Sequence, residues 1–300
     1  MVAPIKEVRW AITGGAGQLA RSLVDLLDKQ GVTYRAWGKK DLDISRLESA
    51  SQIREFSPSV IVNCAAWTNV DRAENQYSEA LAVNRDGARN ISIIAKELEI
   101  PLVHISTDYV FSGNSKSPWK VEDETGPTSK YGETKLLGEL QVMGTWPDKT
   151  SILRTAWLYG PYGKNFAKTI VRKVITTKDS LRVVHDQKGQ PTTTSDLAQR
   201  VFECVNAGVP YDVYHATNSG EATWWDFARE LTLLSGESAN RIIPVTSVEF
   251  PSAVKRPSYS VLDLSSWSKV GLSPMRDWRE ALQEIYPSIR KAVESELSNG

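Results

Sequence analysis

Apolar residues in the first half of the chain fall in short runs that alternate with longer segments of helical periodicity. The runs at 8–13, 33–37, 60–66 and 102–106 are rich in valine, isoleucine and aromatic residues, as in buried strands. The segments between them place leucine, isoleucine or alanine three or four residues apart, which is typical of amphipathic helices. This alternation predicts an α/β fold with a doubly wound parallel sheet of the Rossmann type.

Polar residues, glycine and proline mark where the helices begin and end. The helix after the first strand is expected to end near Gly31. Ser45 is expected to cap a helix that reaches Phe56, and Thr194 or Ser195 is expected to cap a later one. A helix after Pro127 is also expected, because the residues that follow it are good helix formers apart from one glycine.

A glycine-rich turn joins the first strand to its helix, in the context that a dinucleotide-binding fingerprint requires. Gly14 permits the tight turn, and Gly17 lets the backbone approach a pyrophosphate at the positive end of the helix. Small residues end the third strand, so a cofactor could lie close to the backbone there. The predicted cofactor-binding residues are Gly14, Gly17, Gln18, Leu19, Lys39, Asp43, Ile44, Cys64, Ala65, Ala66, Tyr131 and Lys135.

The residues after the second strand decide between NADPH and NADH, because the adenosine ribose lies there. NAD-binding proteins usually carry a carboxylate at this point, whereas this chain offers Lys39 and Lys40. Two ammonium groups favour a 2′-phosphate, so NADPH is the expected cofactor, with Arg35 as a more distant candidate. NADH stays open as the alternative, in which Asp41 or Asp43 turns inward to hold the ribose.

Tyr131 and Lys135 are one helical turn apart, so they share a face of the predicted helix. An ammonium beside a phenol favours phenolate, and Lys135 is therefore expected to lower the pKa of Tyr131. Thr107 ends an apolar run at the edge where an open parallel sheet places its functional residues. These three residues are the candidate catalytic group.

The chain divides into two regions by its pattern. Residues 1–155 are predicted to form a dinucleotide-binding domain, to which segments around 180–215 return. Residues 156–300 are predicted to form mainly a smaller, interleaved C-terminal α/β lobe that binds substrate. This second region contains an expected helix at 165–176 and is mostly helical after 223.

Composition and charge exclude several classes of function. Thirty-six basic residues balance thirty-six acidic ones, so no overall charge attracts nucleic acid or a membrane surface. The chain has no apolar run of about 18 residues and no signal-peptide pattern at its start, so a cytoplasmic protein is expected. Cys64 and Cys204 have no metal-ligand spacing and read as buried thiols, so no metal site is predicted.

Short segments spread through the chain resemble the extended short-chain dehydrogenase/reductases, and most closely the dTDP-4-dehydrorhamnose reductases. The most specific are Ser-Thr-Asp-Tyr-Val-Phe at 106–111 and Asn-Phe-Ala-Lys-Thr at 165–169. The matching segments are 13–19, 63–74, 106–111, 131–135, 154–159, 165–169, 186–192 and 256–257.

This resemblance implies reduction of the C4 ketone of dTDP-4-dehydro-6-deoxy-L-mannose to dTDP-L-rhamnose by a nicotinamide cofactor. It implies that Tyr131 gives a proton to the ketone oxygen, that Lys135 hydrogen-bonds the nicotinamide ribose, and that Thr107 hydrogen-bonds the reacting oxygen. A homodimer is left open. The substrate-binding residues that it implies are Thr107, Asp108, Trp157, Asn165 and Arg256.

Other functions stay open beside this one. A dehydratase of the same superfamily is disfavoured, because it needs a second carboxylate after Asp108 and the chain has Tyr109 there. A C4 epimerase needs little beyond the tyrosine, the lysine and a retained cofactor, and relatives of the family also serve as non-catalytic regulatory subunits. Trp157 could equally be a core tryptophan, and Arg256 a solvated loop arginine.

Overall fold

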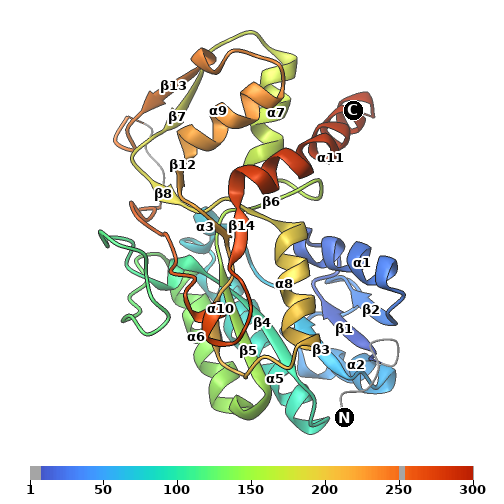
Figure 1. Cartoon of the computed structure of the whole chain (residues 1–300). Helices are drawn as coiled ribbons and strands as arrows, with labels where there is room; N and C mark the ends of the chain where they lie inside the picture. The colour runs from blue at the N-terminus through green and yellow to red at the C-terminus, as the bar shows by residue number, and fades with distance from the viewer. Residues whose placement is uncertain (1–7, 250–253, 300) are drawn as a thin grey trace.

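A six-stranded sheet forms the centre of the larger part of the molecule (Figure 1), in a computed structural model that describes residues 8–249 and 254–299. The strand order is β10-β5-β4-β3-β1-β2, and all five pairings are parallel. The order reverses between β1 and β3, which is the usual position of a ligand in such sheets. The doubly wound parallel sheet predicted from the sequence is confirmed. Its strands are β1 (Trp10–Thr13), β2 (Tyr34–Trp37), β3 (Val60–Asn63), β4 (Leu102–Thr107), β5 (Thr150–Thr155) and β10 (Val213–His215).

Helices cover both faces of this sheet, because successive side chains of a strand point to opposite faces. Trp10 and Ile12 of β1 pack with α1 (Gln18–Gln30) and α8 (Thr194–Asn206), whereas Ala11 packs on the other side. That second face is covered by α2 (Ser51–Phe56), α5 (Ala88–Glu97) and α6 (Lys130–Thr145) (Figure 1). Continuous apolar strands are therefore buried from both sides.

Two predicted helix starts are wrong. The segment from Ser45 to Phe56 is not one helix: a 3₁₀ turn, η2 (Leu47–Ala50), precedes α2. Ser45 does not cap it, because η2 begins only at Leu47 and the residue at its N-cap position is Arg46. The backbone N–H and the hydroxyl of Ser45 both donate to the carboxylate of Asp43. Helix α8 is capped by Thr193 rather than by Thr194 or Ser195, since the Thr193 hydroxyl accepts from the N–H of Asp196.

The smaller part of the molecule lies beyond the carboxyl ends of the sheet strands and packs around its own aromatic core (Figure 1). Phe227 and Trp278 are fully buried there. Its elements are α7 (Phe166–Thr176), α9 (Trp224–Leu234), α11 (Trp278–Ser298), η6 (Ala239–Arg241), β6 (Leu158–Tyr159), β7 (Leu181–Val184), β8 (Lys188–Gly189), β9 (Thr192–Thr193), β11 (Asn218–Ser219), β12 (Ala222–Thr223), β13 (Ile242–Val245) and β14 (Met275–Asp277). The remaining short elements are α3 (Val70–Ala73), α4 (Tyr77–Leu81), the π-helical η3 (Ala82–Gly87), η4 (Asp108–Val110), η5 (Pro147–Lys149) and α10 (Ser266–Lys269).

The segments around 180–215 take part in both regions. Helix α8 packs on α1, and β10 joins the main sheet beside β5. In contrast, β7 pairs with β13 in the smaller lobe. The two-domain division at residue 155 stays a prediction.

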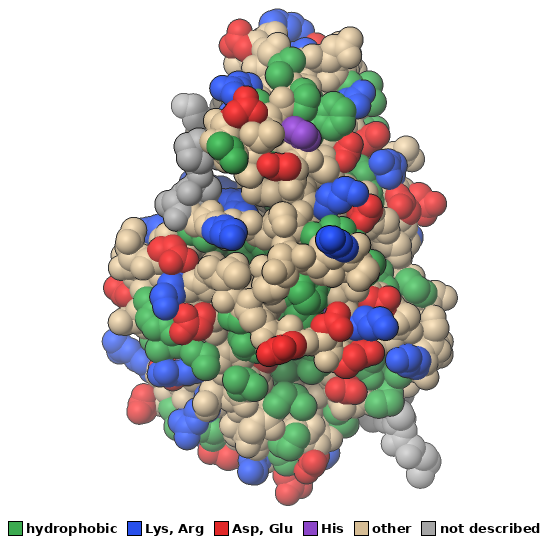
Figure 2. Space-filling view, turned by 90° about the vertical axis from the view of Figure 1, so that its left-hand side faces the viewer, with side chains coloured by type: hydrophobic (Ala, Val, Ile, Leu, Met, Phe, Trp, Pro, Cys, Tyr) green, Lys and Arg blue, Asp and Glu red, His purple; other side chains and the backbone are tan. Residues whose placement is uncertain are grey.

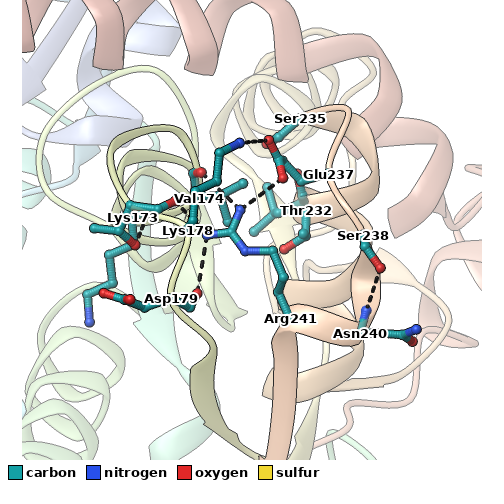
Figure 3. A network of polar contacts seen from close by, with 12 residues as sticks. Lys173, Val174, Lys178, Asp179, Thr232, Ser235, Glu237, Ser238, Asn240 and Arg241 are labelled. Carbon is teal, nitrogen blue, oxygen red and sulfur yellow. Dashed lines mark hydrogen bonds and ion pairs between the residues drawn. The ribbon is translucent and has the colours of Figure 1, made fainter.

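Arg241 ties the end of α7 to the turn after α9 (Figure 3). Its guanidinium donates to the carbonyl oxygens of Val174, Thr177 and Asp179 at 2.7–3.2 Å and to the carboxylate of Glu237 at 3.2 Å. The last carbonyls of a helix have no partner inside the helix. One arginine therefore satisfies the end of α7 and holds it against α9.

On the face drawn in Figure 2, acidic and basic side chains are interspersed over both lobes. This distribution agrees with the balanced charge of the sequence. Among the described residues, no helix combines the length and the apolar character that crossing a membrane requires. The same part of the chain contains no group of three or more histidine, cysteine or acidic residues placed to hold a metal ion.

Candidate active site

A cavity of about 720 Å³ opens at the carboxyl ends of the sheet strands, between the two lobes. It is lined by the glycine turn, by the ends of β3, β4 and β5, and by the first turns of α6. Every residue assigned to a site from the sequence lines this cavity except Asn165. The side-chain oxygen of Asn165 instead caps α7, and its amide group donates to Gln18 at 2.9 Å.

The glycine turn brings backbone close to backbone. Gly14 has φ +70°, and a Cβ at this position would lie 2.7 Å from the backbone nitrogen of Ala65. Gly17 precedes α1 with no side-chain cap, so the first N–H groups of the helix are not capped by that residue. A close turn followed by a helix N-terminus is a binding site for phosphate groups. The residues present therefore fit the pyrophosphate of a dinucleotide.

Of the residues considered for contact with the adenosine ribose, one lysine and one carboxylate line the cavity. Lys39 and Asp43 line it, whereas Lys40 and Asp41 are not among its lining residues. Burial acts to raise the pKa of Asp43, but the hydrogen bonds from Ser45 and the charges of Lys39 and Arg46 together lower it. Arg35 stacks on Trp37 instead, 5.1 Å from the ring centroid.

Tyr131 and Lys135 lie on α6, which begins with the Ser129 hydroxyl accepting from the N–H of Gly132. Burial raises the pKa of Tyr131 to about 12, and a hydrogen bond with Thr107 acts in the opposite direction. The phenol is therefore protonated at neutral pH. Thr107 ends β4 and is itself buried, so strand and helix bring the two hydroxyl groups together.

Lys135 does not lower the pKa of Tyr131 as the sequence suggested. Its ammonium donates to the carbonyl oxygen of Ile105 at 2.7 Å, and burial lowers its own pKa to about 8. The helical spacing placed the two residues on one face correctly. It could not show that the longer side chain turns to the backbone of β4.

Asp108 and Tyr109 close the cavity beside Thr107. Burial raises the pKa of Asp108 to about 6, while hydrogen bonds with Ser260 and Thr107 act against this rise. The ring of Tyr109 contacts that of Tyr131 edge-on, with centroids 5.5 Å apart. Tyr109 was considered in the sequence only for the carboxylate that it replaces, and the structure places it in the cavity wall.

A buried ion pair joins α6, the helix that carries Tyr131 and Lys135, to the sheet. Glu139 of α6 and Arg154 of β5 are 2.8 Å apart, with side chains 5% and 6% exposed respectively. The Ser106 hydroxyl donates to the same carboxylate. Removing one partner of such a pair would leave an uncompensated buried charge, so it fixes α6 against the sheet. Glu139 was not singled out in the sequence, although it lies one helical turn after Lys135.

Two tryptophans and an arginine also line the cavity. The ring of Trp157 stacks on that of Trp224, with centroids 3.4 Å apart and planes inclined by 5°. Trp224 was missed in the sequence, where only a pair of neighbouring tryptophans marked the position. Arg256 lies 3.4 Å from the carboxylate of Asp71, which belongs to α3.

Comparison with known proteins places this site in a family. The family model described as RmlD substrate binding domain matches residues 8–291. A dTDP-4-dehydrorhamnose reductase of Streptomyces griseus is 42% identical over 293 residues, which cover 96% of each chain. The chain belongs to the dTDP-4-dehydrorhamnose reductase family. The family predicted from the sequence is confirmed, and this reductase is an oxidoreductase.

Two further relatives show how evenly the similarity extends. A dTDP-4-keto-6-deoxy-D-glucose reductase of Streptomyces niveus is 43% identical over 94% of this reductase and 97% of that protein. The crystal structure of a dTDP-4-dehydrorhamnose reductase from Bacillus anthracis, in complex with NADP, has a TM-score of 0.89. It is 34% identical and covers 93% of this chain and 99% of its own.

Proposed function

We propose that this protein uses NADPH to reduce the C4 ketone of a dTDP-4-dehydro-6-deoxy-L-sugar, converting dTDP-4-dehydrorhamnose to dTDP-L-rhamnose. The observation that supports this most strongly is that Tyr131, Lys135 and Thr107 line the same cavity as the glycine turn. The glycine turn and these three residues come from segments more than 85 residues apart in the chain. A homodimer and a cytoplasmic location stay predictions.

Tyr131 is the proton donor in this proposal. Its pKa of about 12 keeps the phenol protonated near neutral pH, as a general acid must be before it acts. Lys135 lies on the same face of α6 and would hydrogen-bond the nicotinamide ribose, the role that the family resemblance implies for it. Thr107 holds the C4 oxygen by a hydrogen bond and fixes its distance from Tyr131.

The reduced nicotinamide, when bound, supplies the hydride that C4 accepts. The glycine turn and the start of α1 would hold its pyrophosphate, since Gly14 lets the turn pack against the backbone of Ala65, where a Cβ would clash, and the N-terminus of α1 follows directly. Lys39 would face the 2′-phosphate, which favours NADPH. Asp43 lines the same end of the cavity, so NADH is the alternative that kinetic comparison must address.

NADPH oxidation by the purified chain tests this proposal. It should depend on dTDP-4-dehydrorhamnose, with dTDP-4-keto-6-deoxy-D-glucose as the second substrate of the panel. A C4 epimerase would change the sugar without net loss of NADPH absorbance. A non-catalytic subunit would give neither change, and either result would overturn the proposal.

A further inference from the structure

Trp157 has an unusual backbone conformation for its residue type. It follows β5 with φ 47°, in the left-handed region that side chains other than glycine rarely adopt. Such a conformation persists only where the surrounding structure holds it. Three neighbours do so here: Thr192 donates to the Trp157 carbonyl oxygen at 3.3 Å, Gly189 packs against the indole, and Trp224 stacks on it.

The contact with Gly189 leaves no space for another side chain. A Cβ on Gly189 would lie 2.5 Å from Cε2 of Trp157, closer than any real Cβ contact. Gly189 belongs to β8, which pairs antiparallel with β12 through Ala222. Strand β12 runs directly into α9, where Thr223 and Asp226 form a capping box. The support for the indole is therefore a short, well-bonded unit of the smaller lobe.

Trp224 is the first residue of α9 and belongs to the same unit. Its ring lies almost parallel to that of Trp157 with the centroids 3.4 Å apart, whereas aromatic pairs generally favour offset or edge-on packing. Phe166 supports Trp224 from another side at a centroid distance of 4.6 Å. Trp224 is half-buried and lines the cavity, so it is not an ordinary core residue.

The stacked pair lies close to the position of the reaction. Thr155 is the register partner of Thr107 in the neighbouring strand, and Trp157 follows it by two residues. All three line one cavity together with Tyr131. The part of a sugar nucleotide nearest to Thr107 and Tyr131 is the sugar ring that is reduced.

We propose that Trp224 is a positioning residue, which holds the Trp157 indole in the orientation that forms the wall against the sugar ring of the nucleotide sugar. Gly189 of β8 supports the Trp157 indole from a second side. The identity of the sugar in this proposal rests on the proposed function. The stacked geometry of the two tryptophans is observed independently of it. The proposal assigns the Trp157 contact to the sugar ring and not to the dTDP part of the substrate.

The test compares Trp224→Leu with Trp225→Leu. Trp225 is the matched control because it is also half-buried on α9, but its indole N–H donates to Ile242 and it does not line the cavity. Losing an aromatic stack should weaken binding of dTDP-L-rhamnose roughly 2- to 12-fold in Trp224→Leu. Binding of dTDP alone and the Kd for NADPH should stay within about twofold, and Trp224→Phe should restore most of the loss.

Gly189→Ala is the second variant, and its added methyl group should displace Trp157 and weaken dTDP-L-rhamnose binding in the same direction. Equal weakening of dTDP and dTDP-L-rhamnose by Trp224→Leu would overturn the assignment to the sugar. Unchanged binding of both ligands would overturn the positioning role itself. These titrations need no turnover, so an enzyme that fails to oxidise NADPH would refute the proposed function and leave this inference separately measurable.

Discussion

Replacing Lys135 should change how the stability of the ligand-free protein depends on pH. Burial lowers the pKa of Lys135 from 10.5 to about 8, because the ammonium loses its hydration. The unfolded chain therefore binds more protons than the folded one between these two values. The free energy of unfolding of the wild type should accordingly rise with pH through this window.

The size of the effect follows from the shift of the pKa. At pH 7 the buried ammonium lowers the free energy of unfolding by roughly 3 kcal/mol, at 1.36 kcal/mol per unit. About 2 kcal/mol of this cost should disappear between pH 7 and about 9.5, where the folded protein releases the proton. Lys135→Met contains no ammonium and should not show this gain. The test uses the pH dependence of the stability difference between variant and wild type rather than its value at one pH. The variant also leaves the Ile105 carbonyl without its donor, which changes the stability at every pH.

Denaturant unfolding of both proteins across this pH range measures the difference directly. The stability of Lys135→Met relative to wild type should fall by about 2 kcal/mol as the pH rises. Lys40→Met, at an exposed position, is the matched control and should follow the wild-type pH dependence. A wild-type to Lys135→Met difference that stays constant with pH would refute the assignment of a buried, low-pKa ammonium to this residue.

Three further changes test other parts of the account. Tyr131→Phe should lower kcat about 10²- to 10⁴-fold by removing the proton donor, and Tyr109→Phe should lower it far less, as measured by NADPH absorbance. Lys39→Ala should reduce the kcat/KM preference for NADPH over NADH about 2- to 5-fold, whereas Lys40→Ala should leave it unchanged. Arg241→Lys should lower the free energy of unfolding by about 1–3 kcal/mol, because one ammonium cannot replace the fork of donors at the end of α7.

The local sequence pattern predicted the strands and helices and much of the cavity lining, because these features depend on residues that are close in the sequence. Gly14 and Gly17 follow a strand and open a helix, and Tyr131 and Lys135 are one helical turn apart. Parallel strands then bring their carboxyl ends to one edge, which places Thr107 in the same cavity. No long-range contact had to be known for these inferences.

Contacts between distant segments lay beyond the same reasoning. Trp157 and Trp224 are stacked across 67 positions of sequence, and neither residue carries a spacing signal toward the other. The direction of the Lys135 side chain depends on the Ile105 carbonyl of a neighbouring strand, which helical periodicity does not encode. Ser45 does not cap a helix because it belongs to a local turn in which it donates to Asp43, and the helical residues begin only at Leu47.

Transfer of deuterium from NADPH that carries deuterium at both hydrogen positions of the reactive nicotinamide carbon tests the central claim most directly. After incubation with dTDP-4-dehydrorhamnose, mass spectrometry and NMR of the sugar should find one deuterium at C4 for each NADPH consumed. Cofactor oxidation without label at C4, or a changed sugar with no net loss of NADPH, would contradict reduction of this ketone by the enzyme.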